Sequence, residues 1–114
     1  MNVIAPPVKG FVSVFKTQVL LPLGDNAGRA FAAEKITRIQ ERLVRKFGGY
    51  TAFRRSPAQG VWMHQGERYS DDIVVVEIFS ATLDREWWGE FRRTVEHDLG
   101  QEHLVVYSQE IEQL

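Results

Sequence analysis

The chain has 114 residues, of which 44% are hydrophobic and 25% charged, ordinary proportions for a globular protein large enough to form one core. It contains no cysteine, which excludes disulfides, thiolate catalysis and cysteine-ligated metals and predicts a cytoplasmic protein. No apolar run approaches the roughly 18 residues of a membrane-spanning helix, so no membrane association is expected.

The first elements expected along the chain are an arm and a strand. Positions 1–10 contain two adjacent prolines and a glycine, a composition that predicts a flexible N-terminal arm before a single domain over 11–114. Positions 11–21 alternate in polarity and are rich in β-branched residues, which predicts a strand. Its alternation places Lys16 and Gln18 on the same face.

A helix is expected next, from an N-cap at Asp25 or Asn26 to Lys46. Glycines at 24 and 28 precede it, but the Lys-Ser/Thr ending of a phosphate-binding loop is missing, so an ordinary strand-to-helix turn is expected there. The helix carries one apolar stripe at steps of three and four residues, made by Ala32, Ile36, Ile39, Leu43 and Phe47.

The middle of the chain predicts further strands. Tyr50–Phe53 and Val61–His64 form either one strand interrupted by a loop or the two arms of a hairpin, and the sequence leaves both open. Asp71–Ser80 contains the most apolar run of the chain. Its β-branched residues predict burial on both faces and therefore an interior position in a sheet.

A second helix and a last strand complete the pattern. Thr82 and Asp84 are candidate N-caps, and Gly100 is expected to end the helix. The segment His103–Ile111 alternates in polarity and predicts a strand. The helix has an apolar stripe formed by Trp87, Trp88, Phe91, Val95 and Leu99.

The order strand, helix, strand, strand, helix, strand predicts an α+β protein with the ferredoxin-like β-α-β-β-α-β fold. In this fold a four-stranded antiparallel sheet carries both helices on one face. The first and third strands lie at its centre, so the most apolar segment falls where the fold would bury it.

A series of short signatures runs along the chain: Phe47-Gly48-Gly49-Tyr50-Thr51, Gly60-Val61-Trp62, Gly66-Glu67, the apolar strand Ile73–Phe79, and Leu99-Gly100-Gln101-Glu102. This series resembles one in a family of small bacterial proteins of unknown function. That family is expected to have a ferredoxin-like α+β fold, so the resemblance implies the same architecture and carries over no catalytic residue.

The sequence contains few groups typical of a catalytic centre. The histidines at 64, 97 and 103 have no metal-ligand spacing, and no nucleophile motif is present, so neither a metal nor a cofactor is expected. His97, in a charged run, is expected to face solvent. Trp62 lies at a loop–strand junction, where it would contact a ligand or close a sheet edge. His64, in the strand expected at Val61–His64, is a further candidate ligand or interface residue.

Glu77 is the one charged residue in the central apolar strand, and burying a carboxylate is costly unless it is paired. Alternation places it on the face that no helix would cover, together with Lys16, Gln18 and Tyr107 of the neighbouring strands. A group of Lys16, Glu77 and Tyr107 would bind a polar substrate or transfer a proton. The alternative is a structural ion pair at a dimer interface. Three apolar side chains share this face, those of Ile73, Val75 and Phe79.

These features predict a small cytoplasmic dimer that acts as an interaction or small-ligand-binding module through its open sheet face. The alternative is a cofactor-independent enzyme of the dimeric α+β barrel kind, which rests on fold analogy. Basic residues dominate positions 29–55, but acidic residues dominate from 67 onward and the isoelectric point is about 6.3, so nucleic-acid binding is not expected.

Overall fold

The fold is seen in a computed structural model that describes residues 12–64 and 67–114, with backbone alone at 12, 54–64 and 67–72. The arm expected at 1–10 lies outside the described residues. The elements follow the expected order: β1 Val12–Pro22, α1 Ala33–Phe47, β2 Thr51–His64, β3 Glu67–Ser80, α2 Arg85–Leu99 and β4 Val105–Gln113.

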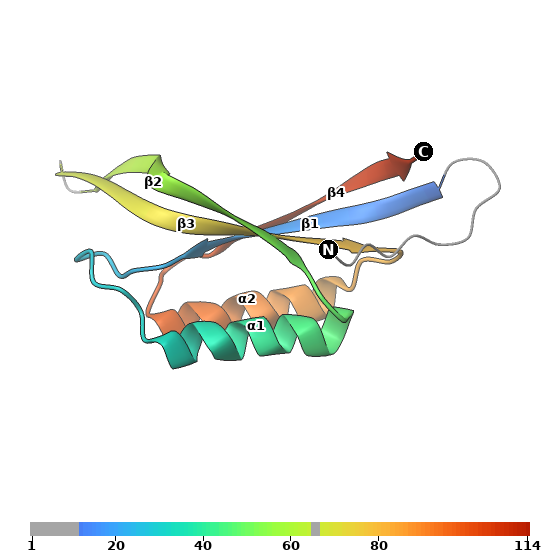
Figure 1. Ribbon diagram of the computed structural model, residues 1–114, viewed down its shortest axis with the longest axis horizontal. Helices are drawn as coiled ribbons and strands as arrows, with labels where there is room; N and C mark the ends of the chain where they lie inside the picture. The colour runs from blue at the N-terminus through green and yellow to red at the C-terminus, as the bar shows by residue number, and fades with distance from the viewer. Residues whose placement is uncertain (1–11, 65–66) are drawn as a thin grey trace.

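The four strands form one sheet in the order β2-β3-β1-β4, and each neighbouring pair is antiparallel. Both helices lie side by side on one face of this sheet, and the other face carries no helix (Figure 1). This arrangement is the ferredoxin-like α+β fold predicted from the sequence, with β1 and β3 at the centre.

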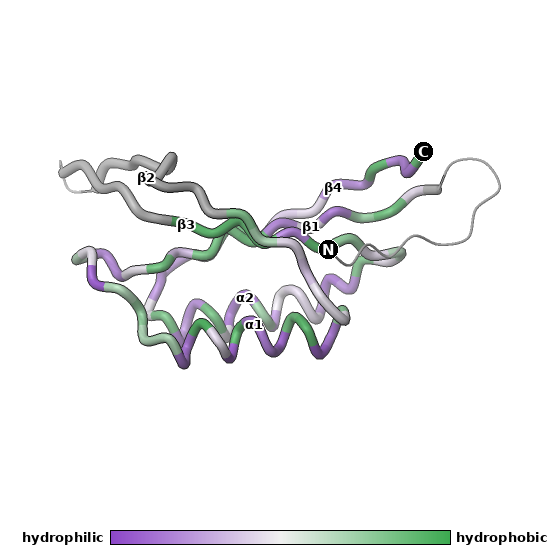
Figure 2. Tube along the Cα trace, viewed as in Figure 1, coloured by the Kyte–Doolittle hydropathy of each residue, from purple (hydrophilic) through white to green (hydrophobic). Residues whose placement is uncertain are grey.

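The core lies between the helices and the sheet, because alternate residues of the central strands face the apolar stripes of both helices. Hydrophobic residues gather where the strands cross above the helices, whereas polar and apolar positions alternate along the helices themselves (Figure 2). Neither helix of the described chain is long and apolar enough to cross a membrane. The buried residues of this core include Val19, Leu21, Ile39, Leu43, Val76, Ile78, Trp88, Phe91, Val95, Leu99 and Leu104.

The segment between α1 and β3 is one continuous strand and not a separate hairpin. It pairs with β3 at Thr51–Arg55 and again at Gly60–His64, and its register shifts between Arg55 and Gly60. This irregularity falls on the Pro-Gly stretch that the sequence marks as a loop. The pairing places Thr51, the first residue of β2, opposite Glu77.

The expected start of the first helix was wrong. Asp25 caps a turn instead: its Oδ1 accepts the backbone N–H groups of Ala27 and Arg29, both at 2.9 Å. These hydrogen bonds, that of Arg29 first, hold the pKa of the Asp25 carboxyl below its ordinary value. The helix begins at Ala33, and Ala32 at its N-cap position offers no side-chain hydrogen bond.

The expected start and end of the second helix were correct. Asp84 accepts the backbone N–H of Trp87 at 3.0 Å, and Gly100 ends the helix in the left-handed conformation with φ of 61°. The two adjacent tryptophans differ in burial, because neighbouring residues on a helix point about 100° apart. Trp88 is buried at 6% exposure, whereas Trp87 lies half-buried at the margin of the helix layer.

The sheet is longer than the helix layer. Strands of 14 residues extend roughly 46 Å at about 3.3 Å per residue, whereas helices of 15 residues extend only about 22 Å. The molecule accordingly measures 53 × 26 × 24 Å. At one end β3 stops opposite Phe15, and positions 12–14 of β1 pair with β4 alone.

Candidate functional site

The helix-free side of the sheet, here called the open face, carries a surface that is largely apolar. Phe53 of β2 is 42% exposed and Val105 of β4 is also 42% exposed. Val75, which the register places between Phe53 and Leu20, is buried at 2% exposure. The other apolar side chains that alternation assigns to this face are Val14, which is also buried at 2%, Ile73, Phe79 and Ile111.

Four polar residues lie in one line across the open face, one from each strand. The register places Thr51 opposite Glu77, Glu77 opposite Gln18, and Gln18 opposite Tyr107. Directly opposed residues in an antiparallel sheet project to the same side, with Cβ atoms about 4.5–5.5 Å apart. We call this line, Thr51–Glu77–Gln18–Tyr107, the polar row.

Hydrogen bonds connect three members of the polar row. Gln18 Nε2 donates to Glu77 Oε2 at 2.7 Å, and the Tyr107 hydroxyl donates to Gln18 Oε1. Glu77 and Gln18 are half-buried, whereas Tyr107 is 43% exposed. The Gln18 amide thus links a carboxylate at the centre of the sheet with a hydroxyl at its edge.

Lys16 is not the partner of Glu77 that the sequence suggested. The register places Lys16 opposite Phe79, two residues along β1 from the position that faces Glu77. Within the described part of the chain no ion pair joins Lys16 to Glu77, and Tyr107 reaches Glu77 only through Gln18. The expected group of Lys16, Glu77 and Tyr107 is therefore replaced by Gln18, Glu77 and Tyr107.

Thr51 is the member of the polar row that the sequence did not identify. Its Oγ1 atom is buried and has no hydrogen-bond partner. The alternation of β2 alone gives no reason to select Thr51, because its significance depends on lying opposite Glu77. That register could not be assigned while the sequence left the 50–64 segment open between one strand and two.

Trp62 and His64 lie near the far end of β2, where their backbones pair with Tyr69 and Glu67 of β3. Their side chains are outside the described part of the structure, so their roles as ligand or edge residues stay predictions. Along the strand they are well removed from Thr51 and the polar row.

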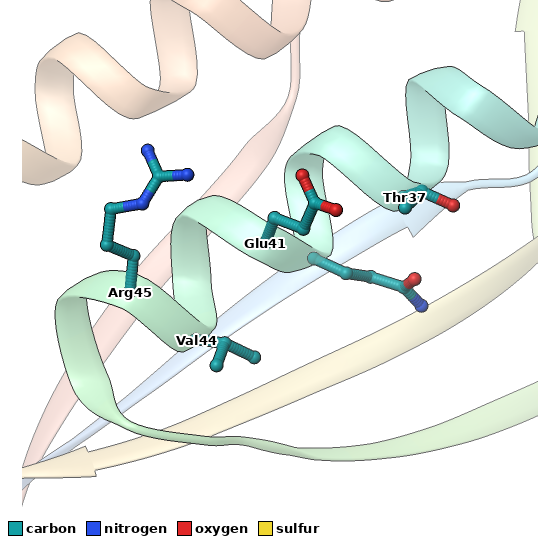
Figure 3. Close-up of a pocket in the computed structure, with 5 residues that line it drawn as sticks. Thr37, Glu41, Val44 and Arg45 are labelled. Atoms are coloured by element: carbon teal, nitrogen blue, oxygen red, sulfur yellow. The ribbon is translucent and has the colours of Figure 1, made fainter.

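Two hollows lie on the helix layer, away from the open face. A shallow one of about 350 Å³ is lined by α1 alone (Figure 3), with Thr37, Glu41, Val44 and Arg45 among its residues. The second, of about 340 Å³, is lined by Lys35, Arg38, His97 and Asp98.

Neither hollow has the character of a built site. In the second hollow, Lys35 Nζ donates to the backbone carbonyl of Asp98 at 3.0 Å, which places a cation on the last turn of α2. His97 is exposed, as expected. Among the residues with described side chains, no group of three histidine, aspartate or glutamate residues is arranged to hold a metal ion.

Comparison with known proteins gives matches to solved structures only. No protein-family model and no curated protein matches the sequence. A phage SAM lyase solved in complex with S-methyl-5'-thioadenosine matches 96% of this chain and 92% of its own, with a TM-score of 0.64 and 15% identity. The same kind of enzyme in its apo state matches 97% of this chain and 91% of its own, with a TM-score of 0.50 and 20% identity. At these identities the likeness shows that the chain shares its fold with a phage SAM lyase.

Proposed function

We propose that the open face binds a small ligand, and that this ligand is a thionucleoside of the S-methyl-5'-thioadenosine type. The observation that carries the proposal is the polar row, a connected chain of hydrogen-bonding groups set in an otherwise apolar surface. Small-molecule sites commonly combine an apolar lining with a few fixed polar groups that set the orientation of the ligand.

The chemistry of the open face suits a ligand with a flat apolar part and a polar edge. Phe53 and Tyr107 offer exposed aromatic surface on which a base can stack. The Glu77 carboxylate accepts hydrogen bonds, so it favours a ligand that presents hydroxyl or amino donors. A thionucleoside has both parts, since its base is flat and its sugar carries hydroxyls.

The fold comparison supports the same ligand class independently of the row. The phage SAM lyase that matches most of this chain was solved with S-methyl-5'-thioadenosine bound. The identity of 15% is too low to transfer any residue, so the proposal for this chain rests on its own open face.

Calorimetric titration with S-methyl-5'-thioadenosine tests the proposal. We expect saturable binding that Glu77→Ala weakens by about tenfold or more, because the ligand loses its acceptor at the centre of the row. Arg45→Ala, on the opposite side of the molecule, is the matched control and should leave the affinity unchanged. Absence of binding at millimolar ligand would contradict the proposal.

We propose that a second copy of the chain packs against the open face to form a dimer. Phe53 and Val105 are exposed there on the two outer strands, and exposed apolar side chains on a face without helices favour an interaction site. Sedimentation equilibrium should show a dimer or higher oligomer at micromolar concentration. A Val105→Lys variant should shift the population to monomer, and a monomeric wild-type protein would contradict this part of the proposal.

The second candidate function is a cofactor-independent enzyme that cleaves SAM. The specific observation in its favour is the continuous link from the Tyr107 hydroxyl through Gln18 to Glu77, which holds an acid–base group in a fixed orientation. Incubation with SAM and chromatography for S-methyl-5'-thioadenosine separates the two functions. Accumulation of that compound above the uncatalysed rate supports the enzyme, and binding without turnover supports the module.

The cytoplasmic location rests on the cysteine-free sequence and remains a prediction. The resemblance to small bacterial proteins of unknown function likewise remains a prediction, because the likeness in fold to a phage SAM lyase does not test it.

A further inference from the structure

We infer that Thr51 is a specificity-determining residue of the open face, and that Thr51 and Glu77 together recognise a hydroxyl group of the ligand by hydrogen bonds. This inference rests on the proposed function, because it assigns the part of the ligand that the polar row recognises. It concerns the one member of the row that has no partner.

The first observation is the isolated hydroxyl. Thr51 Oγ1 is buried and makes no hydrogen bond, although the great majority of buried side-chain polar atoms in proteins have a partner. A buried unpaired hydroxyl is destabilising in the free protein, because it has lost water without gaining a replacement. A valine of nearly the same shape would avoid that loss, so the hydroxyl is not explained by packing.

The second observation is the position of Thr51 opposite Glu77. Oε2 of that carboxylate accepts from Gln18, whereas none of the residues with described side chains donates to Oε1. A carboxylate oxygen to which no described side chain donates and a hydroxyl that is buried in the free protein therefore belong to residues at opposed positions on neighbouring strands.

A hydroxyl is the ligand group that satisfies both atoms. It can accept the proton of the Thr51 hydroxyl and donate its own proton to Glu77 Oε1. A thioether sulfur accepts only weakly and donates nothing, and an anionic oxygen accepts but has no proton to give to a carboxylate. Within a thionucleoside the matching groups are the sugar hydroxyls, which the pair would distinguish from a deoxy sugar.

The experiment combines two protein variants with two ligands. Thr51→Val removes the hydroxyl at constant shape, and Thr51→Ser keeps the hydroxyl as the matched control. S-methyl-5'-thioadenosine is compared with its 2',3'-dideoxy analogue, which lacks both sugar hydroxyls. Affinities are measured by calorimetric titration, and the melting temperature of each ligand-free variant is measured in parallel.

The expected result has three parts. Thr51→Val should weaken binding of the full ligand about tenfold, leave the dideoxy analogue within about twofold, and keep or raise the ligand-free melting temperature. Thr51→Ser should bind the full ligand as the wild type does. Together these outcomes would separate recognition of the hydroxyl from a general loss of the site.

Each other outcome overturns the inference. Equal losses with both ligands, or no loss with either, would show that Thr51 does not read a hydroxyl while leaving the proposed function intact. A lower melting temperature for ligand-free Thr51→Val would show a structural role for the hydroxyl. Failure of the wild-type protein to bind the full ligand would remove the proposed function, and the inference with it.

Discussion

Glu77 occupies a position where a carboxylate is costly, since its neighbours on the open face are mostly apolar. The hydrogen bond from Gln18 Nε2 offsets part of that cost, because bonds to a carboxylate are shorter and stronger than neutral ones. Gln18 is in turn fixed by Tyr107, so its amide cannot rotate without losing one bond. The three residues therefore stabilise one another.

We expect Glu77→Ala to lower the free energy of unfolding by about 1–3 kcal/mol, because it leaves the Gln18 amide half-buried without its acceptor. Glu77→Leu should cost less, since an apolar group of similar size can replace a paired carboxylate. A double-mutant cycle with Gln18→Ala, measured by urea denaturation, should give a coupling energy clearly above zero.

The control for this cycle is Lys16→Met, because the sequence alone suggested that Lys16 pairs with Glu77. Its coupling with Glu77→Ala should be close to zero, because the register sets Lys16 opposite Phe79. A larger coupling for Lys16 than for Gln18 would contradict the polar row.

For the residues of the polar row, the sequence identified the face of the sheet correctly but not the contacts between side chains. Strict alternation was enough to place Gln18, Glu77 and Tyr107 together, because one face of a strand is fixed by parity alone. Which residue stands opposite Glu77 depends on how far each strand slides along its neighbour, and local pattern does not determine that. Thr51 was missed for the same reason.

At the scale of elements, the connection between α2 and β4 is held by Glu96. Arg92 Nη1 donates to both of its carboxylate oxygens, at 2.9 and 2.8 Å, and the backbone N–H of Leu104 donates to Oε2 at 2.9 Å. The bond from Leu104, followed by that from Arg92, holds the pKa of Glu96 below its ordinary value, although partial burial acts to raise it. Glu96 thus joins the helix to the residue before the edge strand.

Loss of the Glu96 charge should destabilise the protein in a pH-dependent way. A carboxyl with a lowered folded pKa contributes stability above its unfolded value near 4.5, and that contribution is lost as the pH falls through the folded pKa. We expect Glu96→Gln to lower the free energy of unfolding at pH 7 by about 1–3 kcal/mol. The difference from wild type should shrink below pH 4.5 in urea denaturation curves, and a constant difference down to pH 3 would contradict the assignment.

The helices show which element boundaries a sequence can predict. Asp84 and Gly100 were read correctly because the residues between them keep a continuous helical period. Asp25 was misread because a side chain that caps a helix can equally cap a turn, and Asp25 closes the loop to Arg29 instead. Whether the segment after α1 forms one strand or two could not be decided from local pattern, since that depends on its pairing with β3.

At the scale of the whole molecule, the two helices place the basic segment beside acidic groups of the second half of the chain. Lys46 Nζ lies 3.2 Å from Asp84 Oδ2, and this exposed ion pair links the end of α1 to the start of α2. Arg42 lies over the rings of Trp87 and Phe91, at 5.7 and 5.3 Å from their centroids. Part of the basic charge on α1 is therefore directed toward α2.

From this arrangement we expect no tight binding of nucleic acid. A filter-binding assay with single-stranded RNA at about 150 mM salt should give a dissociation constant weaker than micromolar. Submicromolar affinity with a steep dependence on salt would show that the basic residues of α1 act as a phosphate-binding surface after all.

At one end of the sheet β1 extends beyond β3, and we expect the native state to open there first. A ribbon of two strands is marginally stable by itself, whereas the four-stranded centre is held by pairing on both sides and by the core. Amide protons at 12–14 should therefore exchange with deuterium well before that of Val19, giving a gradient of protection that increases inward along one strand. Exchange followed residue by residue by NMR would record this gradient, and uniform protection from Ser13 to Val19 would mean that the sheet opens as a single unit.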